Sequence, residues 1–225
     1  MYNLIKRLAD LFVSAIALVL LSPLLIPIMI GLRLTGEGYI FYLQERVGYQ
    51  QKRFNIYKFA TMLKNSPNMG TGDITLKNDP RITPMGPFLR KTKINELPQL
   101  INVFMGQMSI VGPRPLMPVS FAMYQPEHAE KVYHSKPGIT GIGSLIFRDE
   151  ESLVTNAKER GIEPRTFYLE SIYPYKGQLE MWYQSHKSFY TDLMIILLTA
   201  WAILFPTSNL AYRIFKDLPE RPKDI

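Results

Sequence analysis

The sequence predicts an α/β domain that is rich in helix, with short strands and much irregular chain, beside an N-terminal membrane helix. The 17 prolines and 14 glycines in 225 residues indicate many turns. Residues 39–42 are aromatic and have the composition of a strand. Residues 54–59 alternate apolar and polar side chains, as a strand or the start of a helix does. The apolar run at 8–30 is long enough for a membrane helix.

Composition narrows the class of partner. The formal net charge of +7 indicates an anionic partner: nucleic acid, phospholipid headgroups or the phosphates of a nucleotide. The chain has no cysteine, so it has neither a disulfide framework nor a cysteine metal site. Its three histidines, His128, His134 and His186, do not have the spacing of metal ligands.

The N-terminal apolar run allows more than one topology. It is too long for a signal peptide and shows no clear cleavage site. It offers the ~20 apolar residues that a spanning helix needs. Lys6, Arg7 and Arg33 place positive charge at both ends, and the positive-inside tendency keeps both ends in the cytoplasm. The residues alone favour a spanning helix and a re-entrant helix about equally.

Ser22 and Pro23, in the middle of this run, predict a bend. Proline lacks a backbone donor, so it bends or breaks a helix and frees a carbonyl, and Pro27 adds to this effect. We expect the Ser22 hydroxyl to bond to the freed carbonyl. A helix bent at this pair can dip into one leaflet and return.

The chain is organised around residues 77–115, which are dense in basic side chains. Apolar positions after Pro98 predict a short amphipathic helix with Glu96 at its mouth, because proline fits a first helical turn. Arg90 precedes this helix, and Arg114 follows it on a proline-rigid turn. A carboxylate ringed by guanidinium groups near a helix N-terminus suits phosphates or a divalent metal. A surface helix with ordinary salt bridges fits these residues equally well.

Other features have two interpretations each. Gly138, Gly141 and Gly143 indicate a close approach of the backbone to another group. Residues 148–151 form an acidic cluster, and the solvated start of a helix is favoured there over a catalytic role. Lys58 is more readily a solvated lysine than a site residue.

The C-terminal part contains a second apolar segment at 193–205, which is too short to span a membrane. Phe189, Tyr190 and Trp201 are amphipathic aromatics that favour the membrane interface slightly over a buried core helix. Residues 213–225 are polar and contain proline, which predicts a mobile tail.

Several motifs, taken in order, resemble the bacterial sugar transferases that are monotopic phosphoglycosyl transferases. No single motif is specific, but together they extend over nearly the whole chain, from about Lys6 to Phe205, which leaves little room for chance. The matching segments are 6–11 with the apolar run and Ser22-Pro23, 44–48, 56–59, 77–81, 88–92, 96–100, 111–115 and 137–141.

The resemblance implies transfer of a sugar-1-phosphate from a nucleotide diphosphate sugar, usually a UDP-sugar, to undecaprenyl phosphate, with release of UMP. It implies Mg²⁺ as cofactor and a place in the first membrane step of surface glycan assembly. It resolves the topology as a re-entrant helix at 1–34 and a catalytic domain at 35–205 with interfacial C-terminal helices, followed by a polar tail at 206–225. The domain is then expected on the cytoplasmic face of the bacterial inner membrane, in contact with membrane lipids. A homodimer stays open, and the membrane segment argues against a nucleic-acid partner.

The resemblance also assigns roles to residues. The family's catalytic pair is Asp-Glu followed by Leu-Pro, and the Asp is thought to attack the phosphate. Here the pair is Asn95 and Glu96. An amide is a poor nucleophile, whereas a carboxylate can attack phosphorus. Glu96 is then the expected Mg²⁺ ligand and the best remaining catalytic carboxylate, and Asn95 marks the nucleophile position and hydrogen-bonds the phosphate.

Four cationic residues are expected to bind substrate phosphates. Arg90 and Arg114 match family arginines, whose guanidinium forks suit phosphate oxygens. Lys58 matches a lysine near the site and would neutralise developing charge, and Arg81 is a weaker candidate. The structural alternatives are that Arg114 only braces its turn and that Lys58 only extends to the membrane surface.

Three explanations of Asn95 stay open. The chain is a silenced form with an Asp→Asn change, or a natural branch in which Glu96 or a carboxylate of 149–151 takes the role, or an enzyme that transfers directly. Other departures, at 142–150 and at Glu180, favour the natural branch. The second function is a catalytically silent family member that binds nucleotide-sugar or lipid phosphate as a regulatory or assembly protein.

Overall fold

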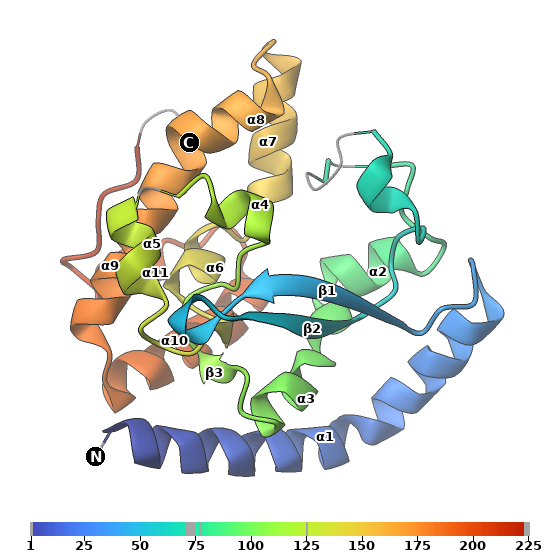
Figure 1. The fold of residues 1–225 in the computed structure, drawn as a ribbon, viewed down its shortest axis with the longest axis horizontal. Helices are drawn as coiled ribbons and strands as arrows, with labels where there is room; N and C mark the ends of the chain where they lie inside the picture. Colours follow the sequence, from blue (N-terminus) through green and yellow to red (C-terminus); the bar gives the residue numbers. More distant parts are fainter. Residues whose placement is uncertain (1, 71–74, 77, 125, 223–225) are drawn as a thin grey trace.

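The computed structural model describes residues 2–70, 75–76, 78–124 and 126–222 and shows a helix-rich domain above one long helix (Figure 1). The predicted class, with many helices and few short strands, is confirmed. Lys77, which opens one of the matching motifs, and residues 223–225 of the expected tail lie outside the described residues. The helices are α1 (Tyr2–Leu34), α2 (Gly86–Lys91), α3 (Gln99–Phe104), α4 (Pro118–Phe121), α5 (Pro126–Val132), α6 (Ile142–Ile146), α7 (Glu150–Glu159), α8 (Pro164–Phe167), α9 (Tyr173–His186), α10 (Phe189–Leu204) and α11 (Leu210–Ile214). The strands are β1 (Phe41–Val47), β2 (Arg53–Phe59), β3 (Ser109–Val111) and β4 (Gly138–Thr140).

Two small sheets carry residues of the site. β1 and β2 form an antiparallel hairpin in which Tyr42 lies opposite Lys58. The strand expected at 39–42 begins at the third of these residues and continues into a polar segment, and 54–59 is a strand rather than the start of a helix. β3 and β4 pair in parallel.

The glycines around β4 pack directly on the turn that follows β3. A Cβ atom on Gly138 would lie 2.1 Å from the nitrogen of Gly112, and one on Gly141 would lie 2.1 Å from the oxygen of Gly112. A Cβ on Gly143 would lie 2.5 Å from Oε1 of Glu180. The close approach predicted for these glycines is therefore confirmed, and the group approached by the first two is the backbone of the Gly-Pro-Arg-Pro turn.

The main hydrophobic core lies between α6, α7, α9, α10 and α11. Phe215 and Leu218 are buried in it, and the Phe215 ring lies 5.0 Å from the ring of Trp182 on α9. The prediction of a mobile polar tail at 213–225 is therefore wrong for its described residues. Two apolar side chains in a polar stretch give no periodic pattern, yet they are enough to attach it to the core.

α1 bends about midway along its length (Figure 1). Pro23 and Pro27 lie inside the helix. The Ser22 hydroxyl donates to the Val19 carbonyl at 2.7 Å. That carbonyl is four residues before Pro23, so it is the one that the missing N–H of Pro23 leaves free. The predicted role of Ser22 is confirmed.

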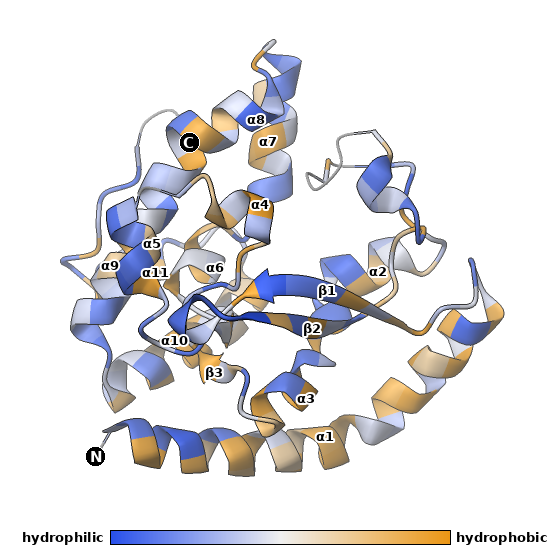
Figure 2. Cartoon of the chain, viewed as in Figure 1, coloured by the Kyte–Doolittle hydropathy of each residue, from blue (hydrophilic) through white to orange (hydrophobic). Residues whose placement is uncertain are grey.

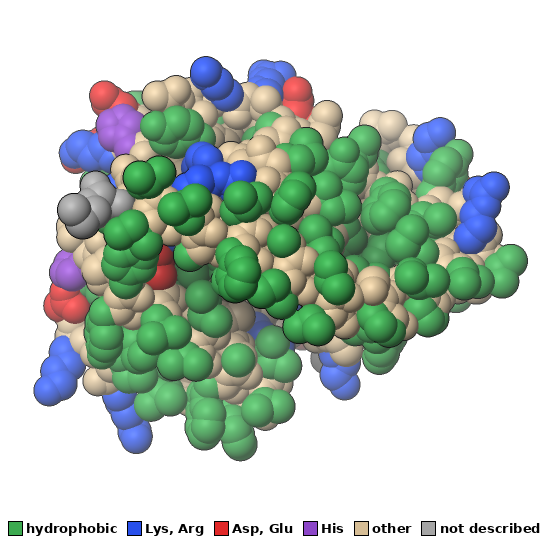
Figure 3. Space-filling model, turned by 90° about the horizontal axis from the view of Figure 1, so that it is seen from below, with side chains coloured by type: hydrophobic (Ala, Val, Ile, Leu, Met, Phe, Trp, Pro, Cys, Tyr) green, Lys and Arg blue, Asp and Glu red, His purple; other side chains and the backbone are tan. Residues whose placement is uncertain are grey.

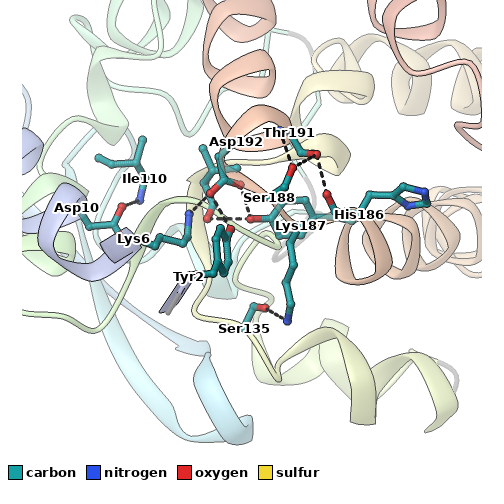
Figure 4. A network of polar contacts seen from close by, with 12 residues as sticks. Tyr2, Lys6, Asp10, Ile110, Ser135, His186, Lys187, Ser188, Thr191 and Asp192 are labelled. Carbon is teal, nitrogen blue, oxygen red and sulfur yellow. Dashed lines mark hydrogen bonds and ion pairs between the residues drawn. The ribbon is translucent and has the colours of Figure 1, made fainter. Parts of the chain in front are cut away.

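The first half of α1 is attached to the domain through a buried carboxylate, Asp192 at the start of α10 (Figure 4). Asp192 accepts hydrogen bonds from the Tyr2 hydroxyl at 2.8 Å and the Lys6 ammonium at 2.6 Å. The Tyr183 hydroxyl, from α9, donates to its second oxygen at 2.7 Å. One carboxylate therefore joins three helices.

A second set of contacts attaches α1 to α3 and β3. Arg7 donates to the carbonyls of Val103 and Phe104, at 2.7 and 2.8 Å, which lie in the last turn of α3. Asp10 accepts the backbone N–H of Ile110 at 3.0 Å. The C-terminal end of α3 therefore packs against α1.

The second half of α1 packs by apolar contact. Leu25, Ile28 and Leu32 form a buried cluster with Phe59 of β2 and Leu89 of α2. Both halves of the bent helix thus lie against the same domain.

One side of the molecule is apolar. α1 is hydrophobic along most of its length (Figure 2), and the view from its side of the molecule shows mainly hydrophobic side chains (Figure 3). Among the described residues α1 is the helix long and apolar enough to cross a membrane, and only 17% of its most apolar window is buried. A core helix of a soluble protein would be mostly buried, so this surface is suited to an apolar medium. Exposed apolar side chains include Leu4, Leu8, Phe12, Ile16, Val19, Leu20, Leu24 and Ile30 of α1, Phe104 and Met105 at the end of α3, and Phe189, Tyr190, Leu193, Leu197, Trp201 and Leu204 of α10.

Replacement of Asp192 by Asn should loosen α1. The change leaves the Lys6 ammonium without its anion in a largely buried position, which should cost roughly 2–3 kcal/mol of unfolding free energy. Thermal unfolding and limited proteolysis between α1 and β1, both in detergent, measure the effect. Glu45→Gln, which removes an exposed ion pair with Arg53, is the matched control. A variant as stable and protease-resistant as the parent would contradict this role of Asp192.

Candidate active site

Three charged side chains from separate elements meet at one point, which we call the Glu96 centre: Lys58 of β2, Glu96 of a 3-10 turn, and Arg114 after β3. Glu96 Oε1 lies 3.6 Å from Lys58 Nζ and 3.5 Å from Arg114 Nη2. The side chains of Lys58 and Glu96 are each 15% exposed and that of Arg114 is 35% exposed. The structure therefore brings together three of the residues predicted for the site, and Lys58 is not a solvated lysine.

Local geometry presents Glu96. Lys93 has a left-handed backbone conformation (φ 61°) and reverses the chain before the turn Ile94–Glu96. Pro98 then begins α3, as predicted. Asn102 of α3 holds the helix against β2, since it accepts the N–H of Tyr57 at 2.9 Å and donates to the Asn55 carbonyl at 2.8 Å. Lys58, the next residue of β2, is thereby set beside Glu96.

Arg114 is fixed in position through its backbone, and its side chain is 35% exposed. Its N–H donates to Glu180 Oε1 at 3.3 Å, and its carbonyl accepts the Tyr133 hydroxyl at 2.8 Å. The turn is thus braced by α9 and by the chain after α5, while the guanidinium points to Glu96.

The electrostatics of the Glu96 centre are dominated by positive charge. Burial alone would raise the pKa of Glu96, but the nearby charges of Lys58 and Arg114 outweigh it and hold the pKa well below its ordinary value. Burial lowers the pKa of Lys58 to about 7, with Arg46 and Arg114 adding to the effect and Glu96 opposing it. Glu96 is therefore ionised at neutral pH, and the surrounding cations exceed the negative charge present.

A second carboxylate group lies beside Arg114, at the start of α7. Glu150 Oε2 accepts a hydrogen bond from the Lys176 ammonium at 2.7 Å, and the charge of this carboxylate helps to raise the pKa of the nearby Tyr168. The charges of Glu96 and of Glu150 both raise the pKa of Arg114. Glu151, the next residue, forms an ion pair with Arg90. The acidic cluster at 148–151, favoured above as a solvated helix start, thus pairs one carboxylate with Arg90 and holds a second one near enough to act electrostatically on Arg114.

Two predicted residues are used differently. Arg81 is 3% exposed; it pairs with Asp79 at 2.6 Å and donates to the carbonyls of Ser66 and Met69. These contacts organise the loop before α2 rather than the Glu96 centre. Arg90 is directed to Glu151 at the edge of the centre, although its charge acts on Lys58.

Sequence reasoning missed Arg46 and Lys176. Arg46 donates to the Pro115 carbonyl at 3.2 Å and acts electrostatically on Glu96. Tyr42 lies opposite Lys58 in the hairpin, and Arg46 is four residues after Tyr42 on the same strand. Because alternate residues of a strand point to the same face, Arg46 lies on the face that carries Lys58. This period of two along β1 is the sequence signal that could have identified it. Lys176 lies on α9, and no local pattern distinguishes it from a surface lysine.

The residues can be tested against a magnesium ion. The described part of the chain contains no group of three or more His, Cys, Asp or Glu side chains placed to hold a metal. Mg²⁺ commonly uses one or two carboxylates together with substrate phosphates. Among the described residues, the amide oxygen of Asn95 is buried without a hydrogen-bond partner, next in sequence to the Glu96 carboxylate. Carboxylate and amide oxygens are donors that Mg²⁺ accepts, so the types of residue present are compatible with Mg²⁺ that is bound mainly through substrate phosphates.

The arrangement defines a class of protein: a helix-rich domain on a long apolar helix, with a cationic, carboxylate-containing site suited to phosphate chemistry. A family profile described as bacterial sugar transferase matches residues 1–206. The chain therefore belongs to the bacterial sugar transferase family, which is a family of enzymes.

Three relatives illustrate the similarity. An uncharacterized sugar transferase of Haemophilus influenzae is 32% identical over 221 residues, 92% of this chain and 41% of that protein. The exopolysaccharide production protein ExoY of Sinorhizobium fredii is 35% identical, over 67% of this chain and 72% of that protein. The UDP-glucose:undecaprenyl-phosphate glucose-1-phosphate transferase of Xanthomonas campestris pv. campestris is 34% identical, over 88% of this chain and 38% of that protein. The chain thus spans about two fifths of the length of the first and third relatives.

A pH test follows from Glu180. Burial raises its pKa from 4.5 to about 7. Between these values the folded protein keeps a proton that the unfolded chain has lost, so the parent loses stability as pH rises through this window. Glu180→Gln keeps the acceptor for the Arg114 N–H but cannot ionise. The free energy of unfolding of Glu180→Gln, relative to that of the parent, should therefore increase by on the order of 3 kcal/mol between pH 4.5 and pH 7.5. Unfolding experiments in detergent measure this difference. Parallel pH profiles of the two proteins would show that Glu180 does not hold this proton.

Proposed function

We propose that this chain transfers a sugar-1-phosphate from a UDP-sugar to undecaprenyl phosphate, giving undecaprenyl-diphosphate-sugar and UMP, as the first membrane step of surface glycan assembly. The observation that carries the proposal is the Glu96 centre, where buried cations exceed the carboxylates around them. A diphosphate substrate and a lipid phosphate would supply the missing negative charge. The names of relatives support the same substrates, since they include undecaprenyl-phosphate glucose and galactose phosphotransferases.

The position of the site relative to the apolar surface also supports a lipid substrate. Glu96 lies just before α3, and the far end of α3 is capped by Arg7 of α1. A helix of this length measures ~9 Å. The Glu96 centre is therefore close enough to the apolar surface for the headgroup of a lipid phosphate to contact Arg114.

We assign the roles as follows. Arg114 binds the phosphate that is transferred, with Arg90 at the edge of the site, and Lys58 neutralises charge that develops as UMP leaves. Glu96, with Asn95 as its neighbour in sequence, would hold Mg²⁺, which would neutralise charge on the substrate phosphates. Glu96 also orders the two cations, since both contact its Oε1.

The membrane topology belongs to the same proposal. Both halves of α1 contact one domain, so a straight spanning helix would remove one half from its contacts. We therefore place α1 as a re-entrant helix and α10 at the interface, on the cytoplasmic face of the bacterial inner membrane.

A binding-only protein is the second candidate, and Asn95 is the observation that favours it. Such a protein would hold nucleotide-sugar or lipid phosphate at the Glu96 centre without turnover. Release of UMP from UDP-glucose, UDP-galactose and their N-acetylamino counterparts, with undecaprenyl phosphate and Mg²⁺, separates the two. Lipid-dependent UMP release supports the enzyme; tight nucleotide-sugar binding without release supports the binder.

Arg114→Ala should lower the rate of UMP release by about 10²-fold or more, because a charge held on the transferring phosphate is lost. Arg160→Ala, at the exposed end of α7, is the matched control and should keep the parental rate. A loss of only a few-fold for Arg114→Ala would show that this arginine merely braces its turn.

Pro23→Ala should straighten α1, because the Val19 carbonyl regains its N–H partner. The sequence has no cysteine, so single cysteines introduced at Leu4 and Leu34 report topology without background. In the parent both cysteines should react with an impermeant thiol reagent from the same side of the membrane. In Pro23→Ala one of them should become accessible from the other side. Unchanged labelling would assign the topology to contacts with the domain rather than to the proline.

A further inference from the structure

Asn95 leaves the site without a carboxylate at the position where the resemblance places a nucleophile. A covalent route then needs another carboxylate that is ionised, partly open to solvent, oriented by fixed partners and close to the arginine that binds the phosphate. We propose that Glu150 is this nucleophile: it attacks the substrate phosphorus and carries the phosphosugar before transfer to the lipid. The inference rests on the proposed function.

The other nearby carboxylates are already committed. Glu96 is held between two cations through one oxygen and is 15% exposed. Glu180 accepts the Arg114 N–H with one oxygen, and its other oxygen is buried without a partner among the described residues, out of reach of a substrate. Glu151 is paired with Arg90 at the rim. Glu150 is 23% exposed and is paired with Lys176 of α9, one helical turn before Glu180.

Fixed partners orient Glu150. Lys176 binds its Oε2 at 2.7 Å and is itself 8% exposed. The Lys176 ammonium also lies 5.0 Å from the centre of the Phe147 ring, so packing and charge together fix its position. Tyr168 also lies near this carboxylate and helps to lower its pKa. The charges of Lys176 and Arg114 outweigh the effect of burial and lower the pKa of Glu150, which keeps it ionised.

Arg114 connects Glu150 to the rest of the site. It lies 3.5 Å from Glu96, and Glu150 acts on it electrostatically from the start of α7. A phosphate bound to Arg114 would therefore lie in the electrostatic field of both carboxylates. This places the proposed nucleophile within the same charge cluster without any rearrangement of the fold.

The proposed steps balance without a proton or an oxidant. A Glu150 carboxylate oxygen forms a bond to the sugar-bearing phosphorus of the UDP-sugar, and the bond from that phosphorus to the bridging oxygen breaks. UMP leaves with the electron pair. An oxygen of undecaprenyl phosphate then bonds to the same phosphorus, the bond to the Glu150 oxygen breaks, and the carboxylate is restored.

The experiment uses the full chain in detergent with Mg²⁺ and the four UDP-sugars above, each labelled with ³²P at the sugar-bearing phosphate. The active donor is first identified with undecaprenyl phosphate present. Without lipid, that donor should then give a burst of about one UMP per chain and a labelled protein, and mass spectrometry of its peptides should place the phosphosugar on Glu150. Glu150→Gln should lose the label and at least about 10³-fold in turnover. Glu159→Gln, an exposed position on the same helix, is the matched control and should keep both.

A rescue separates a nucleophile from a positioning residue. Asn95→Asp added to Glu150→Gln should restore label, now on position 95, and turnover; a Glu150 that only supports the fold would not be rescued. Turnover by the parent without burst or label, or a label on Glu96 or elsewhere, overturns the inference and leaves the proposed function standing. A parent that releases no UMP with any of the four donors and lipid overturns the proposed function, and the inference with it.

Discussion

The backbone of Gly112 is the contact on which the site depends. Gly138 and Gly141 approach it to distances that no side chain would allow, so β3 and β4 pair closely and the Gly-Pro-Arg-Pro turn has one position. Tyr133 and Glu180 then hold the backbone of Arg114 on either side. The direction of the guanidinium toward Glu96 is thus decided by residues outside the Glu96 centre. Enlarging either glycine would displace Arg114 as well as the strand pair.

The charge balance of the free site explains why it suits a phosphate ligand. Lys58, Arg46 and Arg114 are gathered around one carboxylate, and burying that excess costs free energy, as the pKa of Lys58 near 7 indicates. Glu150 and Glu151 offset part of it from α7. A diphosphate would offset the rest, so the cations are ordered before the substrate arrives and need little reorganisation when charge develops. A surface helix with ordinary ion pairs would have no such imbalance.

Whether a feature could be predicted from the sequence depends on how far apart in the chain its interacting residues lie. The Ser22 contact and the helix after Pro98 obey local rules, and both are as expected. The meeting of Lys58, Glu96 and Arg114 came from the resemblance, because no local pattern relates residues that far apart. Arg46 and Lys176 look solvated in sequence and become site residues only through the register of the hairpin and the contact of α7 with α9. Arg81 was expected at the site, yet its charge is used by Asp79 two residues away. The tail contact of Phe215 and Leu218 was missed because two apolar residues carry no period.

The contacts that hold the bent α1 against the domain also fix the position of the Glu96 centre. Asp192 and the end of α3 hold the first half of α1, while Leu25, Ile28 and Leu32 hold the second half against β2 and α2. α3 runs from the Glu96 turn to the first half of α1, and Asn102 attaches α3 to the strand that carries Lys58. Moving either half of α1 would therefore shift α3 or β2, and with it one member of the Glu96 centre. A straight helix would satisfy only one of the two halves. The proline-bent geometry is then what keeps the apolar surface and the Glu96 centre at a fixed separation, about the length of α3, as the proposed reaction between a soluble nucleotide and a membrane lipid would require.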